Sequence, residues 1–230
     1  MNNTALLESI DFEINDNTNR YYNQEGKSVP RVTEILGCFN KDDRLMMWAN
    51  HLGFRGIKYR DELNRAASIG EAAHKHIEMY LKEKIQANNI PFQGYLMWEN
   101  VLAEKGIYVE PIYVEEKLEC QWFGGTTDAV LRVNNRVFDV DFKSSNHITY
   151  KYFLQLAAYR YMLEHTRHIH IDGVIILQLD KKVPGFNEYL LDFNNPAHLQ
   201  FIKECEQAFF ALVYAYYHMT YAEHQYKLIF

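Results

Sequence analysis

Apolar and polar residues alternate along two neighbouring segments in the middle of the chain, residues 126–133 and 136–143. Such alternation predicts two β-strands, because successive side chains on a strand point to opposite faces. The two segments are separated only by Asn134 and Asn135, and Asn tolerates the positive φ angles that a two-residue turn requires. The pattern therefore predicts a tight β-hairpin.

The register of this hairpin brings acidic residues together. If Val133 pairs with Arg136 across the turn, Asp128 lies directly opposite Asp141. Two carboxylates in that position lie about 5 Å apart at Cβ and repel each other. A divalent cation between them removes the repulsion. Lys143 lies two residues beyond Asp141 and therefore on the same face of the strand, which completes a candidate hydrolytic site.

Segments whose apolar residues recur with the helical period lie before and after the hairpin. The predicted helices span residues 31–39, 43–52, 61–86, 92–105 and 149–164. A final helix of about 25 residues follows, with Asn195 as its N-cap and Pro196 in its first turn. Further strands are predicted between residue 107 and the hairpin, at 174–179 and at 189–193.

These elements fit one α/β domain that spans residues 1–230. No internal repeat, linker or low-complexity tract divides the chain. Residues 1–27 are polar and rich in Asn, so we expect a peripheral hairpin or a loose segment there, with residues 10–14 paired to 20–23.

Composition narrows the function class. The chain has a net charge of −6 and so lacks the overall positive charge of many nucleic-acid-binding proteins. Basic residues would therefore have to be concentrated in a local channel to bind nucleic acid. Cys38, Cys120 and Cys205 lie far apart and have no metal-binding spacing. Neither a signal pattern nor an apolar run of about 18 residues occurs, so we expect a cytoplasmic protein without membrane contact, in the host cytoplasm if it is phage-encoded.

Four short motifs follow one another along the chain. They are Gly-Glu-Ala-Ala-His at 70–74, Gly-Thr-Thr-Asp at 125–128, Asp-Phe-Lys at 141–143 and Gln-Leu-Ala-Ala-Tyr at 155–159. Together they resemble the motif set of the PD-(D/E)xK nuclease superfamily, and more narrowly its RecB-like exonuclease group. Residues 28–33, with Trp48 after them, are similar to a segment of the mitochondrial genome maintenance exonucleases and their phage relatives. The chain departs from the pattern at Glu71, often Thr in the family, and at Thr127, where the superfamily is named for Pro.

The resemblance implies a fold and a metal site. The fold would be the restriction-endonuclease-like core, a mixed sheet flanked by helices in the order αβββαβ, with an N-terminal helical elaboration. The catalytic residues would be Asp128, Asp141 and Lys143. One or two Mg²⁺ or Mn²⁺ ions would be held by His74, Asp128, Asp141 and the carbonyl of Phe142, since hard cations prefer oxygen ligands. Lys143 would activate the attacking water or stabilise the transition state.

Substrate contacts are expected mainly from the helix after Lys143. Gln155 and Tyr159 lie one turn apart and share a face, from which both would reach a phosphate. Lys151 extends the same stripe by one turn, and Ser144 would position phosphate through its hydroxyl or backbone N–H. A basic and aromatic run is our candidate for guiding the strand, and comprises Trp48, Arg55, Lys58, Arg60 and Arg65.

Each motif taken alone also has a purely structural interpretation. The hairpin would then be a surface element with solvated Asp and Lys, His74 a helix-surface or core histidine, and Tyr159 a core residue. Glu78, Glu115 and Glu116 are weaker candidates for carboxylates near the metal.

The sequence thus predicts a metal-dependent DNA exonuclease that acts on single-stranded or processed ends. Aromatic stacking suits single strands because it tolerates any base. The alternatives are a structure- or site-specific DNA endonuclease, and a non-catalytic nuclease-fold module that binds nucleic acid or protein. A recombination or replication protein is a conceivable partner. We expect no iron–sulfur cluster, since the cysteines of the cluster-containing relatives are absent, and no ATP, since the chain lacks a Walker A motif.

Overall fold

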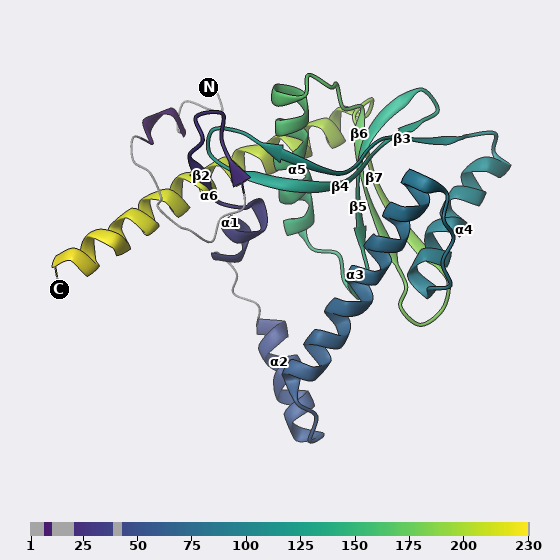
Figure 1. Cartoon of the computed structure of the whole chain (residues 1–230), viewed down its shortest axis with the longest axis horizontal. Helices are drawn as coiled ribbons and strands as arrows, with labels where there is room; N and C mark the ends of the chain where they lie inside the picture. Colours follow the sequence, from purple (N-terminus) through teal and green to yellow (C-terminus); the bar gives the residue numbers. More distant parts are fainter. Residues whose placement is uncertain (1–6, 11–20, 39–42, 230) are drawn as a thin grey trace.

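A computed structural model of the protein describes residues 7–10, 21–38 and 43–229. At its centre is a mixed sheet with the strand order β3-β4-β5-β6-β7 (Figure 1). The strands are β3 (Val109–Glu119), β4 (Gly124–Val133), β5 (Arg136–Lys143), β6 (Gly173–Leu179) and β7 (Phe186–Asp192). β5 and β6 run parallel, and the other neighbouring pairs of this sheet run antiparallel.

Helices cover both faces of the sheet (Figure 1). They are α1 (Val32–Cys38), α2 (Asp43–Phe54), α3 (Tyr59–Glu83), α4 (Ile90–Glu104), α5 (Tyr150–Thr166) and α6 (Pro196–Ile229), preceded by the short elements η1 (Leu7–Ser9), β1 (Tyr21–Tyr22) and β2 (Ser28–Val29). α5 makes the crossover between the parallel strands β5 and β6. The order from α4 to β6 is the αβββαβ order of the restriction-endonuclease-like core, which confirms the predicted fold class, and α3 precedes it as an additional helix. Within the described ranges, no helix has the length and apolar character needed to cross a membrane.

The hairpin between β4 and β5 has the predicted register. Val133 pairs with Arg136, and Asn134 and Asn135 form the turn with φ angles of 49° and 64°. The side chain of Asn tolerates this left-handed conformation better than most, which explains why the turn uses it twice.

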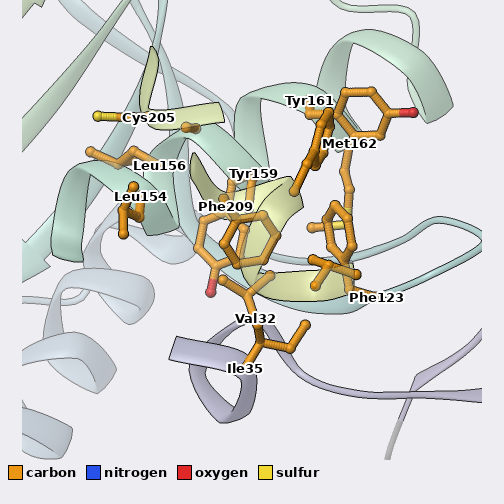
Figure 2. Packing of buried hydrophobic residues seen from close by; sticks show 14 of the residues in the cluster. Val32, Ile35, Phe123, Leu154, Leu156, Tyr159, Tyr161, Met162, Cys205 and Phe209 are labelled. Atoms are coloured by element: carbon orange, nitrogen blue, oxygen red, sulfur yellow. The ribbon is translucent and has the colours of Figure 1, made fainter. Parts of the chain in front are cut away.

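Two apolar cores lie on opposite faces of the sheet. On one face, Ile77 of α3 and Phe92 of α4 pack with Val140 of β5. On the other face, α5 and α6 pack over the strands, and Figure 2 shows Phe209 of α6 close to Phe123, with ring centroids 5.0 Å apart. Because both faces are buried, β5 and β6 are held rigidly, and they position the residues at their ends.

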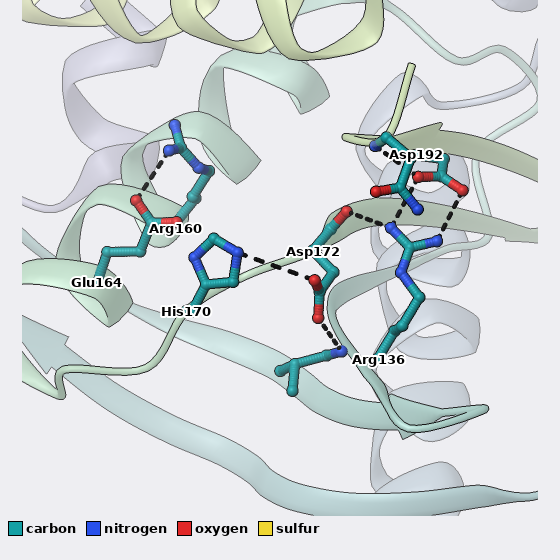
Figure 3. Close-up of polar contacts among 8 residues, drawn as sticks. Arg136, Arg160, Glu164, His170, Asp172 and Asp192 are labelled. Carbon is teal, nitrogen blue, oxygen red and sulfur yellow. Dashed lines mark hydrogen bonds and ion pairs between the residues drawn. The ribbon is translucent and has the colours of Figure 1, made fainter. Parts of the chain in front are cut away.

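An arginine anchors the far end of β5. Nη1 and Nη2 of Arg136 each lie 2.7 Å from an oxygen of Asp192 on β7, and Nη2 also donates to the Asp172 carbonyl at 3.0 Å (Figure 3). This hydrogen-bonded pair lowers the pKa of Asp192 to about 2. The Asp172 carboxylate accepts from the N–H of Val137 at 2.8 Å. The starts of β5 and β6 and the end of β7 are therefore tied together.

The termini of the helices follow the expected capping chemistry. The side chain of Asn195 accepts from the N–H of Ala197 at 3.0 Å, and Gly106 follows α4 with a φ of 74°. α6 is 34 residues long, longer than predicted. No Gly or Pro follows Pro196 in the chain, so nothing ends the helix where its contacts with the core end, and its C-terminal part extends away from the body (Figure 1).

The predicted N-terminal pairing of residues 10–14 with 20–23 falls largely outside the described residues. In the described part, Tyr21 pairs with Val29 and Tyr22 with Ser28. This small hairpin packs against β4, where the ring of Tyr21 lies over Gly124. A Cβ atom at Gly124 would lie 2.6 Å from the Tyr21 side chain, so only glycine fits there.

Candidate active site

The site is built where β4 and β5 separate. Their last ladder pair is Ala129 with Val140, and the next positions are Asp128 and Asp141. There the N–H of Phe142 donates to Oδ2 of Asp128 at 2.7 Å rather than to a backbone carbonyl. A side-chain acceptor thus replaces the ladder bond, and the Asp128 carboxylate is held at the opening between the strands.

His74 approaches Asp128 from α3. Its Nδ1 lies 3.3 Å from Oδ1 of Asp128. Burial disfavours the charged imidazole, but the Asp128 carboxylate outweighs burial and raises the pKa of His74 to about 9. Burial likewise opposes ionisation of Asp128, yet His74 and Lys143 hold its pKa below the usual value. In the metal-free protein the two groups therefore form an ion pair at neutral pH.

Glu115 is the third member of this group. It lies on β3 between the ladder pairs Val114–Ala129 and Glu116–Thr127, which places it across from Asp128. One ligand atom from each of His74, Glu115 and Asp128 lies within 4.8 Å of the others. Burial and the nearby Asp128 raise the pKa of Glu115.

The backbone of Glu115 is strained. Its φ is 54°, a left-handed conformation that is rare for a non-glycine residue within a strand. Strain of this kind costs about 1–3 kcal/mol and persists where the surrounding structure enforces it, often at functional sites. The sequence placed Glu115 only among the weaker candidates, because the register shift of β3 between Pro111 and Tyr113 is not visible in the residue pattern.

Asp141 and Lys143 form a buried pair next to this group. The side chains are 2% and 17% exposed, and Nζ of Lys143 lies 2.5 Å from Oδ1 of Asp141. Burial raises the pKa of Asp141 to about 6, although Lys143 opposes the shift. Burial would lower the pKa of Lys143, but Asp141 and Asp128 outweigh it and raise that pKa. This burial excludes the interpretation as a solvated surface hairpin, and Lys143 is a cation at neutral pH.

An open pocket of about 570 Å³ lies over these residues. Gln155 and Tyr159 of α5 line it, as predicted from their shared helix face, and Nε2 of Gln155 donates to the Tyr159 hydroxyl at 2.9 Å. Burial raises the pKa of Tyr159 well above its usual value, so the phenol keeps its proton. Its hydroxyl is available as a donor to an anionic substrate.

The N-terminal segment supplies a wall of the pocket that the sequence did not indicate. Tyr21 and Arg31 line it, and the Tyr21 hydroxyl lies 2.7 Å from Oγ1 of Thr126. Part of the segment expected at the periphery therefore borders the site. This position depends on the backbone bond from the N–H of Gly124 to the Pro30 carbonyl, a contact between distant parts of the chain.

Several predicted residues lie elsewhere. Lys151 lines a separate apolar hollow with Leu154 and Phe201, because it lies on the side of α5 that faces α6. Ser144 lies next to Lys143 but lines a different polar hollow. Glu116 points away from the site and pairs with Arg167 at 3.1 Å.

The remaining weaker candidate, Glu78, lines the pocket and also forms ion pairs with Lys75 at 3.1 Å and Lys82 at 2.9 Å. Glu71, where the chain departs from the family pattern, lines the pocket as well. The basic and aromatic run lies along α2 and the start of α3, which project from the sheet (Figure 1). Within it, the rings of Trp48 and Tyr59 are 5.4 Å apart.

The donor set fits a divalent cation. His74, Glu115 and Asp128 offer one nitrogen and two carboxylates at suitable mutual distances. Oδ2 of Asp141 is buried and lacks a hydrogen-bond partner in the described part of the chain, and such an orphaned oxygen is costly unless a cation satisfies it. Phe142 is buried, and its N–H rather than its carbonyl is the group seen to contact Asp128.

Comparisons with known proteins add little to this geometry. The chain matches no known protein family and no curated protein. Among solved structures it is similar to SSO0001, with 12% identity and a TM-score of 0.32 over 87% of this chain and 80% of that chain. It is also similar to a phage-related exonuclease from Haemophilus somnus 129PT, with 13% identity and a TM-score of 0.32 over 66% of this chain and 82% of that chain. TM-scores this low assign no activity to the chain.

Proposed function

We propose that this protein is a metal-dependent nuclease that hydrolyses phosphodiester bonds in DNA, and that it acts as an exonuclease on single-stranded or processed ends. The observation that carries the proposal is the convergence of His74, Glu115 and Asp128 beside the buried Asp141–Lys143 pair, in one open pocket. Structural ion pairs do not need such an opening, whereas a reactive site does.

The residues divide into roles by their chemistry. His74, Glu115 and Asp128 would hold Mg²⁺ or Mn²⁺, with Asp141 adjacent, and the bound ion would act as a Lewis acid toward the phosphate. Lys143 is held by Asp141 and carries a positive charge, so it would stabilise charge that develops on the phosphate oxygens. The raised pKa of Lys143 favours this role over that of a general base.

Gln155 and Tyr159 would orient the substrate. Their mutual hydrogen bond fixes both side chains on the pocket side of α5. The neutral phenol would donate to a phosphate oxygen, and Arg31, which also lines the pocket, would add a second cationic contact. The preference for cleavage from DNA ends, rather than at internal sites, rests on the motif resemblance alone and is the finer part of the proposal.

The test compares wild type with Lys143→Ala on end-labelled linear single- and double-stranded DNA and on circular single-stranded DNA, with Mg²⁺, Mn²⁺ or EDTA. We expect metal-dependent loss of linear DNA, with circles spared, and a decrease of about 100-fold or more in the variant. Lys203→Ala, at an exposed position on α6, is the matched control and should retain full activity.

Two outcomes would redirect the proposal. Cleavage of circles would identify an endonuclease. Binding of DNA without cleavage by well-folded wild type in either metal would identify a non-catalytic nuclease-fold module, and the proposal would then be wrong.

A further inference from the structure

A second polar hollow, of about 510 Å³, lies beside the candidate active site. It is formed by the loop between β5 and α5 and by the turn between β6 and β7. Its lining includes the charged residues Asp180, Lys181 and Lys182 and the polar residues Ser144, Asn146 and Asn187. Its volume is within the range of sites that bind small ligands or single groups of a larger one.

The hollow begins one residue beyond the catalytic lysine. Lys143 lines the active-site pocket and Ser144 lines the hollow, and consecutive Cα atoms are about 3.8 Å apart. Gly70 of α3 lines the active-site pocket and lies close to Ser144, since a Cβ atom at Gly70 would be 3.2 Å from Oγ of Ser144. A strand whose phosphate lies at Lys143 would thus reach the hollow within about one or two nucleotides, given the rise of about 3.4 Å per nucleotide of a stacked strand.

The turn that bears the lysines is held in place. Oδ1 of Asp180 accepts from the N–H groups of Lys182 at 2.6 Å and Val183 at 3.2 Å, and the N–H of Asp180 donates to the carbonyl of Gly185 at 3.1 Å. A Cβ at Gly94 of α4 would lie 2.5 Å from the Gly185 carbonyl oxygen, so the turn packs directly on that helix. The turn therefore presents its side chains from a fixed backbone.

The charges of the hollow favour an anion. Lys181 and Lys182 make no ion pair with an acidic side chain within the described ranges, and the Asp180 carboxylate binds backbone N–H groups instead. Lys181 is partly buried, and burial together with the nearby Arg65 lowers its pKa. Two lysine side chains that line one polar hollow offer the positive charge with which a phosphate would pair.

We propose that this hollow binds a backbone phosphate of the substrate strand, one or two nucleotides from the cleaved bond, through Lys181 and Lys182. The inference rests on the proposed nuclease function and extends it from the cleaved phosphate to a neighbouring one. Asn146 and the Ser144 hydroxyl would complete the contacts as neutral donors, whereas the Ser145 hydroxyl already donates to the His147 carbonyl at 3.1 Å.

The test measures binding rather than cleavage. The affinity of wild type and of the double variant Lys181→Gln/Lys182→Gln for a fluorescent single-stranded oligonucleotide is measured in EDTA over a range of salt concentrations. We expect weaker binding by the variant, and a salt dependence of log K that is shallower by about 0.7 for each phosphate that the variant no longer neutralises. Lys181→Arg/Lys182→Arg should restore both.

Uncharged linkages in the oligonucleotide identify the phosphate that the lysines contact. In a series of oligonucleotides, one phosphodiester at a time is replaced by a methylphosphonate, at successive positions. When the methylphosphonate lies at one or two particular consecutive positions, wild type and the glutamine variant should bind the oligonucleotide with equal affinity. The phosphate charge that the lysines bind is then absent. The control Lys105→Gln/Lys203→Gln removes two exposed lysines elsewhere and should leave the salt dependence unchanged.

The outcomes separate the two proposals. If wild type cleaves DNA but the glutamine variant binds with unchanged salt dependence, the phosphate site is wrong and the nuclease proposal stands. If wild type and the glutamine variant differ in affinity wherever the single neutral linkage is placed, the lysines do not contact a phosphate. The inference is then again overturned. If wild type neither binds nor cleaves DNA, both fail.

Discussion

At the residue scale, the ionisation of His74 sets the conditions for metal binding. Asp128, 3.3 Å away, raises the pKa of His74 to about 9, so in the metal-free protein the imidazole is protonated at neutral pH. Its ordinary value is 6.5, so the ion pair stabilises the fold fully below that pH. This stabilisation is lost as the pH rises through about 9. A metal ion must displace the proton before the imidazole can act as a ligand.

We therefore predict that the affinity for Mn²⁺ rises with pH, by about tenfold per unit between pH 7 and 8.5, as one proton is released from His74. Isothermal titration calorimetry at several pH values measures this slope. His74→Gln should weaken binding and flatten the slope, whereas His51→Gln, at an exposed position on α2, should behave as wild type. A slope that is unchanged in His74→Gln would exclude His74 as the ligand that loses the proton.

At the element scale, the packing of α5 against β4 places Tyr159, one of the side chains that we propose to bind substrate. The ring of Tyr159 lies against the backbone of Gly125, where a Cβ atom would be 2.5 Å from Cε1 of the ring. Tyr159 is 3% exposed and cannot move aside into solvent. The glycine of the Gly-Thr-Thr-Asp motif thus allows the helix to approach the strand, and it positions Tyr159 beside the pocket.

Gly125→Ala should destabilise the protein by about 1–3 kcal/mol, because the added methyl group must displace a buried ring or the strand itself. Gly53→Ala is the control: it lies in α2 with no atom within 4 Å of the new Cβ, and should be neutral or stabilising by up to about 1 kcal/mol. Urea unfolding measures both. Equal stability of Gly125→Ala and wild type would show that the contact between α5 and β4 relaxes without cost.

At the scale of the whole molecule, the candidate metal site joins elements that are distant in the chain. His74 comes from α3, Glu115 from β3 and Asp128 from β4, with Asp141 of β5 adjacent. Burial raises the pKa of Asp141 to about 6, which means that its ionised form is disfavoured in the metal-free fold. The contribution of Asp141 to stability therefore decreases as the pH rises from about 4 to about 6, and a bound cation should reverse this loss at neutral pH.

We predict that Mn²⁺ raises the Tm of wild type at neutral pH and that EDTA reverses the shift. Saturation at about 100 times the Kd corresponds to about 2.7 kcal/mol of added stability. Asp128→Asn should abolish the shift, whereas Asp61→Asn, exposed in the first turn of α3, should retain it. Differential scanning calorimetry measures the effect, and an equal shift in both variants would place the metal elsewhere.

The sequence by itself determined the local elements and much of the candidate site. The hairpin turn at Asn134 and Asn135 and the cap at Asn195 follow from residue chemistry that acts over a few positions. The shared face of Gln155 and Tyr159 follows from the helical period, and both residues line the pocket. These properties depend on neighbours in the chain, so the residue pattern contains them.

Only the tertiary structure decided which distant residues meet. Glu115 joins His74 and Asp128 because of a register shift and a left-handed backbone, neither of which has a residue signature here. Tyr21 borders the pocket, whereas Lys151, one turn from Gln155, lies in a separate hollow. In each case the outcome depends on how elements far apart in the chain pack on one another, and local patterns of polarity carry no information about that packing.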